Sequence, residues 1–141
     1  MPLLALALGV HGCTLPRWPV QGPVTSPFGV RWLSLLPEVH TGVDIAVPEG
    51  TPVRAMAAGV VRFAGESGEY GRAIIVDHRG GWSTLYAHLS EIHVQAGTQI
   101  GGHEVIGLSG RTGNATGPHL HFETRAGSRP RDPVPLLGGR P

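Results

Sequence analysis

The sequence predicts an all-β protein built from short strands, on three observations. Glycine and proline are frequent, with 22 Gly and 13 Pro in 141 residues, as expected where many tight turns join short strands. Apolar and β-branched residues occur in short runs that turn-forming residues interrupt. No window of helical length shows a clear helical period of apolar residues. The length suits one domain with a sizeable core.

The predicted strands follow one another closely along the chain. A strand-like segment ends at Pro48-Glu49-Gly50, and two short strands then lie on either side of Gly59. A β-branched run turns at Arg79-Gly80-Gly81 into its hairpin partner. Upstream of the strands, the leucine-rich residues 30–39 are expected to form a loop or a short turn. In chain order, the expected strands are 39–47, 53–58, 60–64, 72–78, 82–89, 94–100, 105–109 and 117–125.

The first residues are interpreted as an export segment. Leu3 to Val10 form an apolar run of the length found in secretory signals. Gly12 before Cys13 resembles a lipobox, so Cys13 would carry lipid and anchor a mature lipoprotein to the membrane. A plain secretion signal and a misassigned start codon are the alternatives. The expected organisation is an export segment over 1–13, an extended linker over 14–21, the domain over 22–138 and a tail over 139–141.

Charge and cysteine content exclude several classes of protein. A net charge of +1 gives no electrostatic case for binding nucleic acid or an acidic membrane surface. The single cysteine excludes an internal disulfide framework. No apolar run is long enough to span a bilayer. We expect a monomer.

The last predicted strand, 117–125, carries two histidines on one face. Side chains two residues apart on a strand point to the same side, so His119 and His121 stand next to each other. Leu120 and Phe122 alternate with them and are expected to face the core. Two imidazoles on a rigid strand are suited to binding a metal ion. The alternative is a pair of solvent-facing histidines.

His40 and Asp44 supply the other ligands of the predicted metal site. They lie four residues apart in an extended segment, so they share one face. Together with one of the strand imidazoles they make three nitrogen and oxygen ligands. Zinc with three protein ligands keeps its fourth position for water, as in catalytic sites. The alternative for His40 and Asp44 is a pair that caps a turn.

Two further residues extend the candidate site. His88 is expected to share a polar strand face with Thr84 and Tyr86, from which it could reach the same cleft. The alternative is an ordinary exposed histidine. Glu123 continues the face of His119 and His121, where it would either orient a ligand imidazole or form a salt bridge to an arginine.

These residues occur in motifs that resemble a known family. His40-x-x-x-Asp44, Tyr86-Ala87-His88-Leu89 and Gly117-Pro118-His119-Leu120-His121, in this order, resemble the LytM/lysostaphin-type zinc endopeptidases. Further matches run from Ser26 to Pro133. The resemblance implies an antiparallel two-sheet, sandwich-like domain of the duplicated hybrid motif type, with a zinc cleft on one sheet.

The resemblance also implies roles for individual residues. His40, Asp44 and His121 match the positions that bind one Zn²⁺ per chain, and His88 and His119 match the catalytic histidines. The implied activity is hydrolysis of peptidoglycan peptides, in cross-links or stem peptides, after export to the periplasm or cell envelope. The residues around 32–39 replace a longer polar loop of many members, which leaves cleft width and substrate preference open.

Two other functions remain as alternatives at this point. A non-catalytic activator of cell-wall hydrolases would bind a partner through the same groove, although such members of the family lack the ligand residues. A structural β module would carry the histidines only incidentally.

Overall fold

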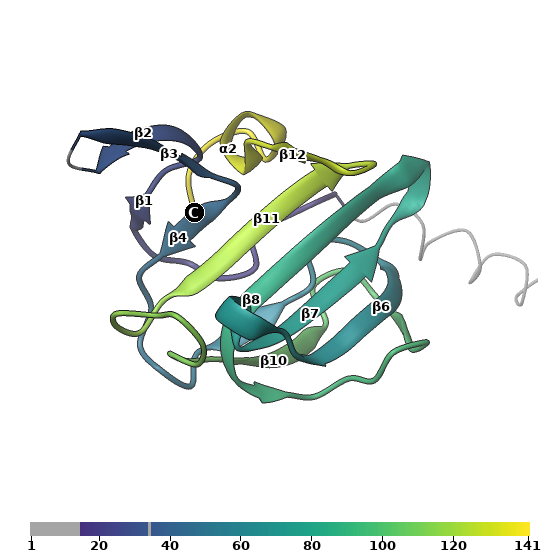
Figure 1. Cartoon of the computed structure of the whole chain (residues 1–141). Helices are drawn as coiled ribbons and strands as arrows, with labels where there is room; N and C mark the ends of the chain where they lie inside the picture. Colours follow the sequence, from purple (N-terminus) through teal and green to yellow (C-terminus); the bar gives the residue numbers. More distant parts are fainter. Residues whose placement is uncertain (1–14, 34) are drawn as a thin grey trace, which may run out of the picture.

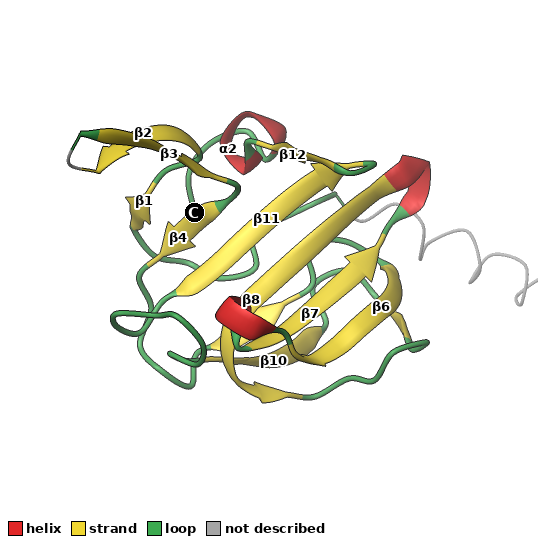
Figure 2. Cartoon of the chain, in the orientation of Figure 1, coloured by secondary structure: helices red, strands yellow, loops and turns green. Residues whose placement is uncertain are grey.

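The computed structural model describes residues 15–33 and 35–141, so the predicted export segment with Cys13 lies outside the described residues. The predicted all-β antiparallel class is confirmed, with strands pairing into a ten-stranded sheet and a separate two-stranded sheet (Figure 1). Within the described residues, helix is confined to one short α-helix and two single turns (Figure 2). Among the described residues, no helix has the length and hydropathy needed to cross a membrane.

The strands are short and closely spaced, as the frequent turn residues predict. Their bounds are β1 Val24–Ser26, β2 Gly29–Leu33, β3 Leu36–His40, β4 Val43–Ile45, β5 Pro52–Arg54, β6 Gly59–Glu66, β7 Arg72–Asp77, β8 Trp82–Ile92, β9 Gln99–Ile100, β10 Val105–Ser109, β11 Leu120–Ala126 and β12 Arg129–Arg131. The helical pieces are η1 Gly68–Tyr70, η2 Arg79–Gly81 and α2 Pro133–Leu136.

Strand β11 occupies the position in the large sheet on which the site depends. The strand order is β1-β4-β11-β8-β7-β6-β9, and β11, β8 and β7 run side by side across the centre of Figure 1. The register places His121 opposite Asp44 of β4 on one side and opposite Ala87 of β8 on the other. The sheet backbone therefore brings Asp44 and His121 together although they are 77 residues apart in sequence.

The two faces of the central strands have different environments. Phe122 and Tyr86 face the main core, where their ring centroids lie 5.4 Å apart. Leu85 and Ala87 face the other side and pack in a small cluster that includes Tyr70. Because directly paired residues share a face, His121 lies on this second side with Ala87. The core thus anchors β11 from behind while its polar residues face the site.

A hairpin replaces the loop expected over residues 30–39. Strands β2 and β3 pair in register from Gly29 and His40 to Leu33 and Leu36, and the hairpin projects from the domain in Figure 1. The exposed fractions of Val30, Trp32 and Val39 are 66%, 70% and 66%. The alternation in Val30-Arg31-Trp32 and in Pro37-Glu38-Val39 covers only three residues in each strand, and its apolar side chains are exposed instead of facing a core.

Several predicted strands are shorter or longer than expected. Of the expected strand 53–58, only the part in β5 is observed. Of the expected strand 94–100, only β9 is observed, because Gln95 to Thr98 form a turn closed by a 3.1 Å backbone hydrogen bond. Strand β8 extends to Ile92. Helix α2 was not predicted, although Asp132 caps it by accepting from the Val134 N–H at 3.0 Å and Pro133 follows the cap.

Trp18, in the stretch interpreted as a linker, contacts the domain. Its ring lies edge-on to Phe122 with centroids 6.1 Å apart, and its indole N–H donates to the Gly139 carbonyl at 3.0 Å. Val20 nearby is buried with the core. The segment with Trp18 and Val20 therefore packs against the core, and Trp18 connects it to Gly139.

Candidate metal centre

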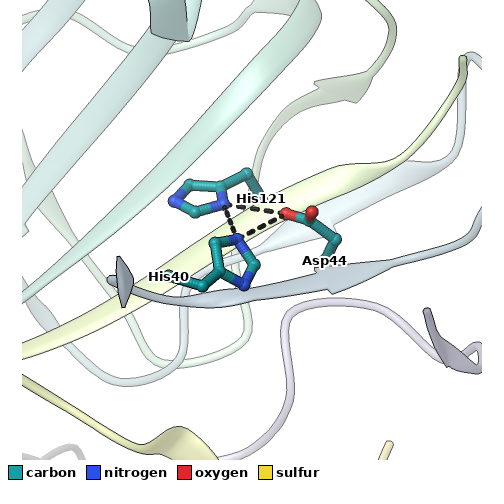
Figure 3. A group of neighbouring side chains, drawn as sticks. All are labelled: His40, Asp44 and His121. Atoms are coloured by element: carbon teal, nitrogen blue, oxygen red, sulfur yellow. Dashed lines mark hydrogen bonds and ion pairs between the residues drawn. The ribbon is translucent and has the colours of Figure 1, made fainter. Parts of the chain in front are cut away.

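Three side chains from three strands converge at one point of the molecule. His40 ends β3, Asp44 lies in β4 and His121 lies in β11 (Figure 3). Nε2 of His40 is 3.3 Å from Oδ1 of Asp44 and 3.3 Å from Nδ1 of His121, which is itself 2.8 Å from the same Oδ1. Gly42 allows the segment between His40 and Asp44 to approach β11 closely, because a Cβ at this position would collide with the Phe122 carbonyl.

The geometry and chemistry of this group fit a zinc ion. Two imidazole nitrogens and one carboxylate oxygen are ligand types that zinc prefers. Ligands about 2.0–2.1 Å from a tetrahedral zinc lie about 3.3–3.4 Å from one another. Two of the three separations are 3.3 Å, so the ligand atoms need to move little to surround an ion.

Neighbouring groups orient the two histidines of this group. Nδ1 of His40 lies 2.9 Å from the Pro27 carbonyl, so this nitrogen carries the proton and Nε2 presents its lone pair. Nε2 of His121 lies 2.9 Å from Oε1 of the buried Glu123. The two rings consequently present different nitrogens, Nε2 of His40 and Nδ1 of His121, to the same point.

Two ionised carboxylates, Asp44 and Glu123, stabilise a positive charge at His121. Burial opposes the charged form of His121, but hydrogen bonds to Asp44 and Glu123 outweigh it and raise the His121 pKa to about 9. Burial would raise the pKa of Asp44, yet hydrogen bonds from His121 and His40 hold it well below its ordinary value. Likewise, hydrogen bonds from His121, Tyr70 and Thr41 outweigh burial and lower the Glu123 pKa to about 2.

His88 and His119 lie together beside the cluster. Their ring centroids are 4.8 Å apart in an edge-on contact, and the His88 ring is 6.0 Å from that of His121. Nδ1 of His88 donates to the Thr112 carbonyl at 2.7 Å, and Nδ1 of His119 donates to the Gly117 carbonyl at 2.9 Å. Each ring therefore keeps Nε2 for other partners, and that of His119 is 3.8 Å from Oδ1 of Asp44.

The prediction that His88 shares a strand face with Thr84 and Tyr86 is wrong, although His88 does lie at the cleft as expected. Thr84 and Tyr86 are buried on the core side, whereas His88 contacts the site histidines. The register of β8 against β7 shifts by one residue between Tyr86 and Leu89, and His88 has a φ of 62°. This bulge turns the imidazole to the opposite side of the sheet. Burial lowers the pKa of His88, and the neighbouring His119 and His121 lower it further.

All five predicted residues line one open cleft of about 570 Å³. Its other lining residues are Thr25, Ser26, Ala46, Glu69, Tyr70, Asn114, Thr116, Gly117 and Pro118. His78, His93 and His103 contact the Ala58 carbonyl, Glu91 and the Leu15 carbonyl instead.

Two residues at the site were missed from the sequence. Tyr70 lies between the expected strands 60–64 and 72–78, and Thr41 lies between two predicted site residues. Both hydroxyls donate to Oε1 of Glu123 at 2.7 Å. These contacts join residues 82 and 53 positions apart, and no local pattern encodes such a pairing. For Glu123 the structure shows both alternatives at once, since it binds His121 and Arg125.

An antiparallel β domain with this ligand group and two adjacent histidines has the features of a metallopeptidase. The sequence from residue 38 to residue 133 matches the profile of peptidase family M23. The chain belongs to this family. The predicted resemblance to LytM/lysostaphin-type peptidases is thereby confirmed.

Named relatives and solved structures agree with this assignment. The chain is 50% identical over 113 residues to the DD-carboxypeptidase/endopeptidase Mpg of Neisseria meningitidis, a match covering 79% of the chain and 26% of that protein. It is 42% identical over 119 residues to the peptidoglycan DD-endopeptidase ShyA of Vibrio cholerae, covering 81% of the chain and 28% of the relative. The chain thus spans about a quarter of the length of these relatives.

Solved structures show the same fold. The catalytic domain of the antimicrobial peptidase lysostaphin from Staphylococcus simulans superposes with a TM-score of 0.76 at 33% identity, covering 84% of this chain and 93% of that one. A zinc-containing peptidase from Vibrio cholerae superposes with a TM-score of 0.78 at 35% identity, covering 84% of this chain and 38% of that one.

Proposed function

We propose that this protein is a zinc-dependent endopeptidase that hydrolyses peptide bonds of bacterial peptidoglycan, in cross-links or stem peptides. The observation that carries the proposal is the convergence of His40, Asp44 and His121 with His88 and His119 in one cleft. Relatives named as peptidoglycan DD-endopeptidases support the substrate class.

His40, Asp44 and His121 would hold one Zn²⁺ per chain. A bound zinc ion polarises a carbonyl group and lowers the pKa of water to about 7, which supplies both an electrophile and a nucleophile for amide hydrolysis. The protein's part is to hold the three ligand atoms together, and the paired strands β4 and β11 do this for Asp44 and His121.

His88 and His119 are proposed to handle protons during hydrolysis. Each has its Nδ1 proton engaged by a backbone carbonyl, so Nε2 is the nitrogen that can accept or donate a proton in the cleft. The lowered pKa of His88 favours its neutral form, which can accept a proton. A protonated ring can then give the proton to the leaving amine or donate to the developing oxyanion.

The activator alternative is less well supported. A protein that only binds a partner has no need to keep three ligand groups and two oriented imidazoles in register. Here the carbonyls of Pro27, Thr112 and Gly117 each fix the tautomer of a different site histidine, which is an arrangement suited to chemistry.

Export is part of the proposal, because the relative ShyA is named a peptidoglycan DD-endopeptidase and peptidoglycan lies outside the cytoplasmic membrane. We propose that the protein reaches the periplasm or cell envelope, with Cys13 as the candidate lipidation site. Replacing Cys13→Ser and following the protein through membrane fractionation tests this. Unchanged fractionation would remove the lipid anchor from the proposal and leave a plain signal sequence.

The decisive experiment combines metal analysis with digestion of purified peptidoglycan. We expect about one zinc per chain, and mass spectrometry of the released fragments should identify the bond that is cut. Absence of bound zinc and of new peptide termini in the digest, with folded protein, would contradict the enzyme and favour the activator. The variant His121→Ala serves as the matched inactive control.

A further inference from the structure

Glu123 is a completely buried carboxylate surrounded by donors. Its exposed fraction is 0%, and Oε1 accepts from Nε2 of His121 at 2.9 Å and from the hydroxyls of Thr41 and Tyr70, each at 2.7 Å. Oε2 accepts from Nε of Arg125 at 2.8 Å and also pairs with its Nη2. Burying an ionised carboxylate is unfavourable unless its oxygens are fully hydrogen-bonded, so these contacts stabilise Glu123 in its charged form.

We propose that Glu123 is a positioning residue for His121, and that Tyr70 and Arg125 hold Glu123 in place for this task. The inference rests on the proposed role of His121 as a metal ligand. An imidazole that binds a metal through Nδ1 must carry its proton on Nε2. Oε1 of Glu123 accepts from Nε2, so it selects this tautomer and sets the rotation of the ring.

Tyr70 restrains the same imidazole in a second way. Its ring is stacked on that of His121, with centroids 5.7 Å apart and an interplanar angle of 28°, while its hydroxyl donates to Glu123. The stacking opposes tilting of the imidazole, and the hydrogen bond fixes the carboxylate that controls its rotation. One tyrosine therefore contributes to both restraints on His121.

Arg125 holds Glu123 in place through its other carboxylate oxygen, Oε2. Its guanidinium lies against Oε2, so the ion pair and the contact to His121 use different oxygens of Glu123. The charge of Glu123 is thereby balanced without removing the acceptor that His121 needs. An ordinary salt bridge would not require three further donors on the second oxygen.

The substitution Glu123→Gln tests the proposal because it keeps the shape of the side chain while it replaces one acceptor oxygen by an NH₂ donor and removes the negative charge. A side-chain amide places its NH₂ group either against His121, Tyr70 and Thr41 or against Arg125, and each of these partners is itself a donor. We expect zinc affinity, measured by chelator competition, to fall about 10- to 100-fold. The absorption spectrum of the Co²⁺-substituted protein should shift as well, because the ligand geometry changes.

Two further variants make the result specific. Tyr70→Phe keeps the stacked ring and removes only the hydroxyl, with its contacts to Glu123 and Arg125, so zinc affinity should fall about two- to tenfold with little change in folding. Glu91→Gln is the matched control, because Glu91 pairs with His93 at 2.8 Å on the surface, and it should leave affinity and spectrum unchanged.

The outcomes separate this inference from the proposed function. If the unsubstituted protein binds no zinc, the proposed metal site itself is wrong. If that protein binds zinc while folded Glu123→Gln and Tyr70→Phe match its affinity and Co²⁺ spectrum, the positioning role is overturned. If Glu123→Gln does not fold, the Tyr70→Phe affinity and spectrum decide, with thermal unfolding of the metal-free proteins as the measure of a purely structural effect.

Discussion

His88 and Tyr86 lie two residues apart on the same strand, yet their side chains lie on opposite faces of the sheet. Tyr86 is buried in the main core against Phe122, whereas His88 contacts His119 in the cleft. The cause is a bulge at which His88 takes a φ of 62°, a left-handed conformation that costs a residue with a Cβ about 1–2 kcal/mol. The fold accepts this strain at a residue to which we assign proton transfer.

The strain at His88 predicts that its glycine and alanine variants differ in stability but lose activity alike. His88→Gly should unfold at higher denaturant than His88→Ala, by about 1 kcal/mol in free energy of unfolding, because glycine adopts positive φ freely. Both variants should lose about a hundred- to ten-thousand-fold in peptidoglycan hydrolysis while retaining zinc. The control pair is His93→Gly and His93→Ala, where glycine should give no advantage. Equal stability of the two His88 variants would argue against the strained conformation.

Metal content distinguishes the proposed ligands from the proposed proton-handling residues. His40→Ala, Asp44→Ala and His121→Ala should each lose zinc and activity together, because two remaining ligands hold zinc weakly. His119→Ala should keep its zinc and lose activity. Zinc stoichiometry measured beside the hydrolysis rate gives the answer. A His119→Ala protein without zinc would mean that His119, and not its neighbour His121, supplies the third ligand.

Gly71 is predicted to be required for the position of His88. It has a φ of 64°, and a Cβ there would lie 2.5 Å from Thr112 and from the Gly113 nitrogen. Because the Thr112 carbonyl holds Nδ1 of His88, Gly71→Ala should displace that histidine and lower activity about a hundredfold with zinc retained.

The control for this prediction is Gly68→Ala, three residues upstream in the same turn. Gly68 also has positive φ, 50°, but a Cβ added there meets nothing within 4 Å. It should cost only the backbone strain, about 1 kcal/mol in the free energy of unfolding. Comparable loss of activity in the two variants would mean that the turn, and not the contact to Thr112, matters.

His78 predicts a pH dependence of folding away from the metal cluster. Burial lowers its pKa, and the Ala58 carbonyl and Asp77 only partly oppose this. Below the unfolded-state value of about 6.5, the unfolded chain binds a proton here that the folded protein resists, so stability falls as pH falls. Above that pH the contribution of His78 is fully present.

Urea unfolding of the chain and of His78→Gln, compared at about pH 8 and about pH 5, isolates this contribution. A chelator should be present, so that release of metal does not contribute to either curve. The other histidines titrate in both proteins, so the difference between the two pH dependences belongs to His78. We expect the substituted protein to lose less stability on acidification; an identical loss would contradict the assignment.

The sequence predicted those parts of the fold whose pattern is local. The segment 105–109 is the observed strand β10, and 72–78 matches β7 to within one residue, because β-branched runs bounded by glycine specify strands directly. The hairpin β2–β3 and the bulge at His88 were missed for related reasons. In the hairpin the alternating stretches, Val30 to Trp32 and Pro37 to Val39, are only three residues long and have no buried face. At His88 a bulge interrupts the period of two on which face assignment depends.

The sequence predicted which residues form the site but not the contacts that orient them. The spacing of His40 and Asp44 and the adjacent His119 and His121 identified the residues that the structure brings together. The partners that orient them could not be found in this way. Oε1 of Glu123 is shared by hydroxyls from distant segments, and only the three-dimensional pairing of those segments reveals the contact.

The location of His121 on β11 determines how the protein should respond to gain and loss of its metal. Because β11 is hydrogen-bonded to a neighbour on each side, at Asp44 and at Ala87, the His121 backbone opens only when the sheet separates. Its amide should therefore be among the slowest to exchange with deuterium, with or without an ion. Zinc would bind at a site whose backbone is already ordered, so little conformational entropy is lost when the metal binds.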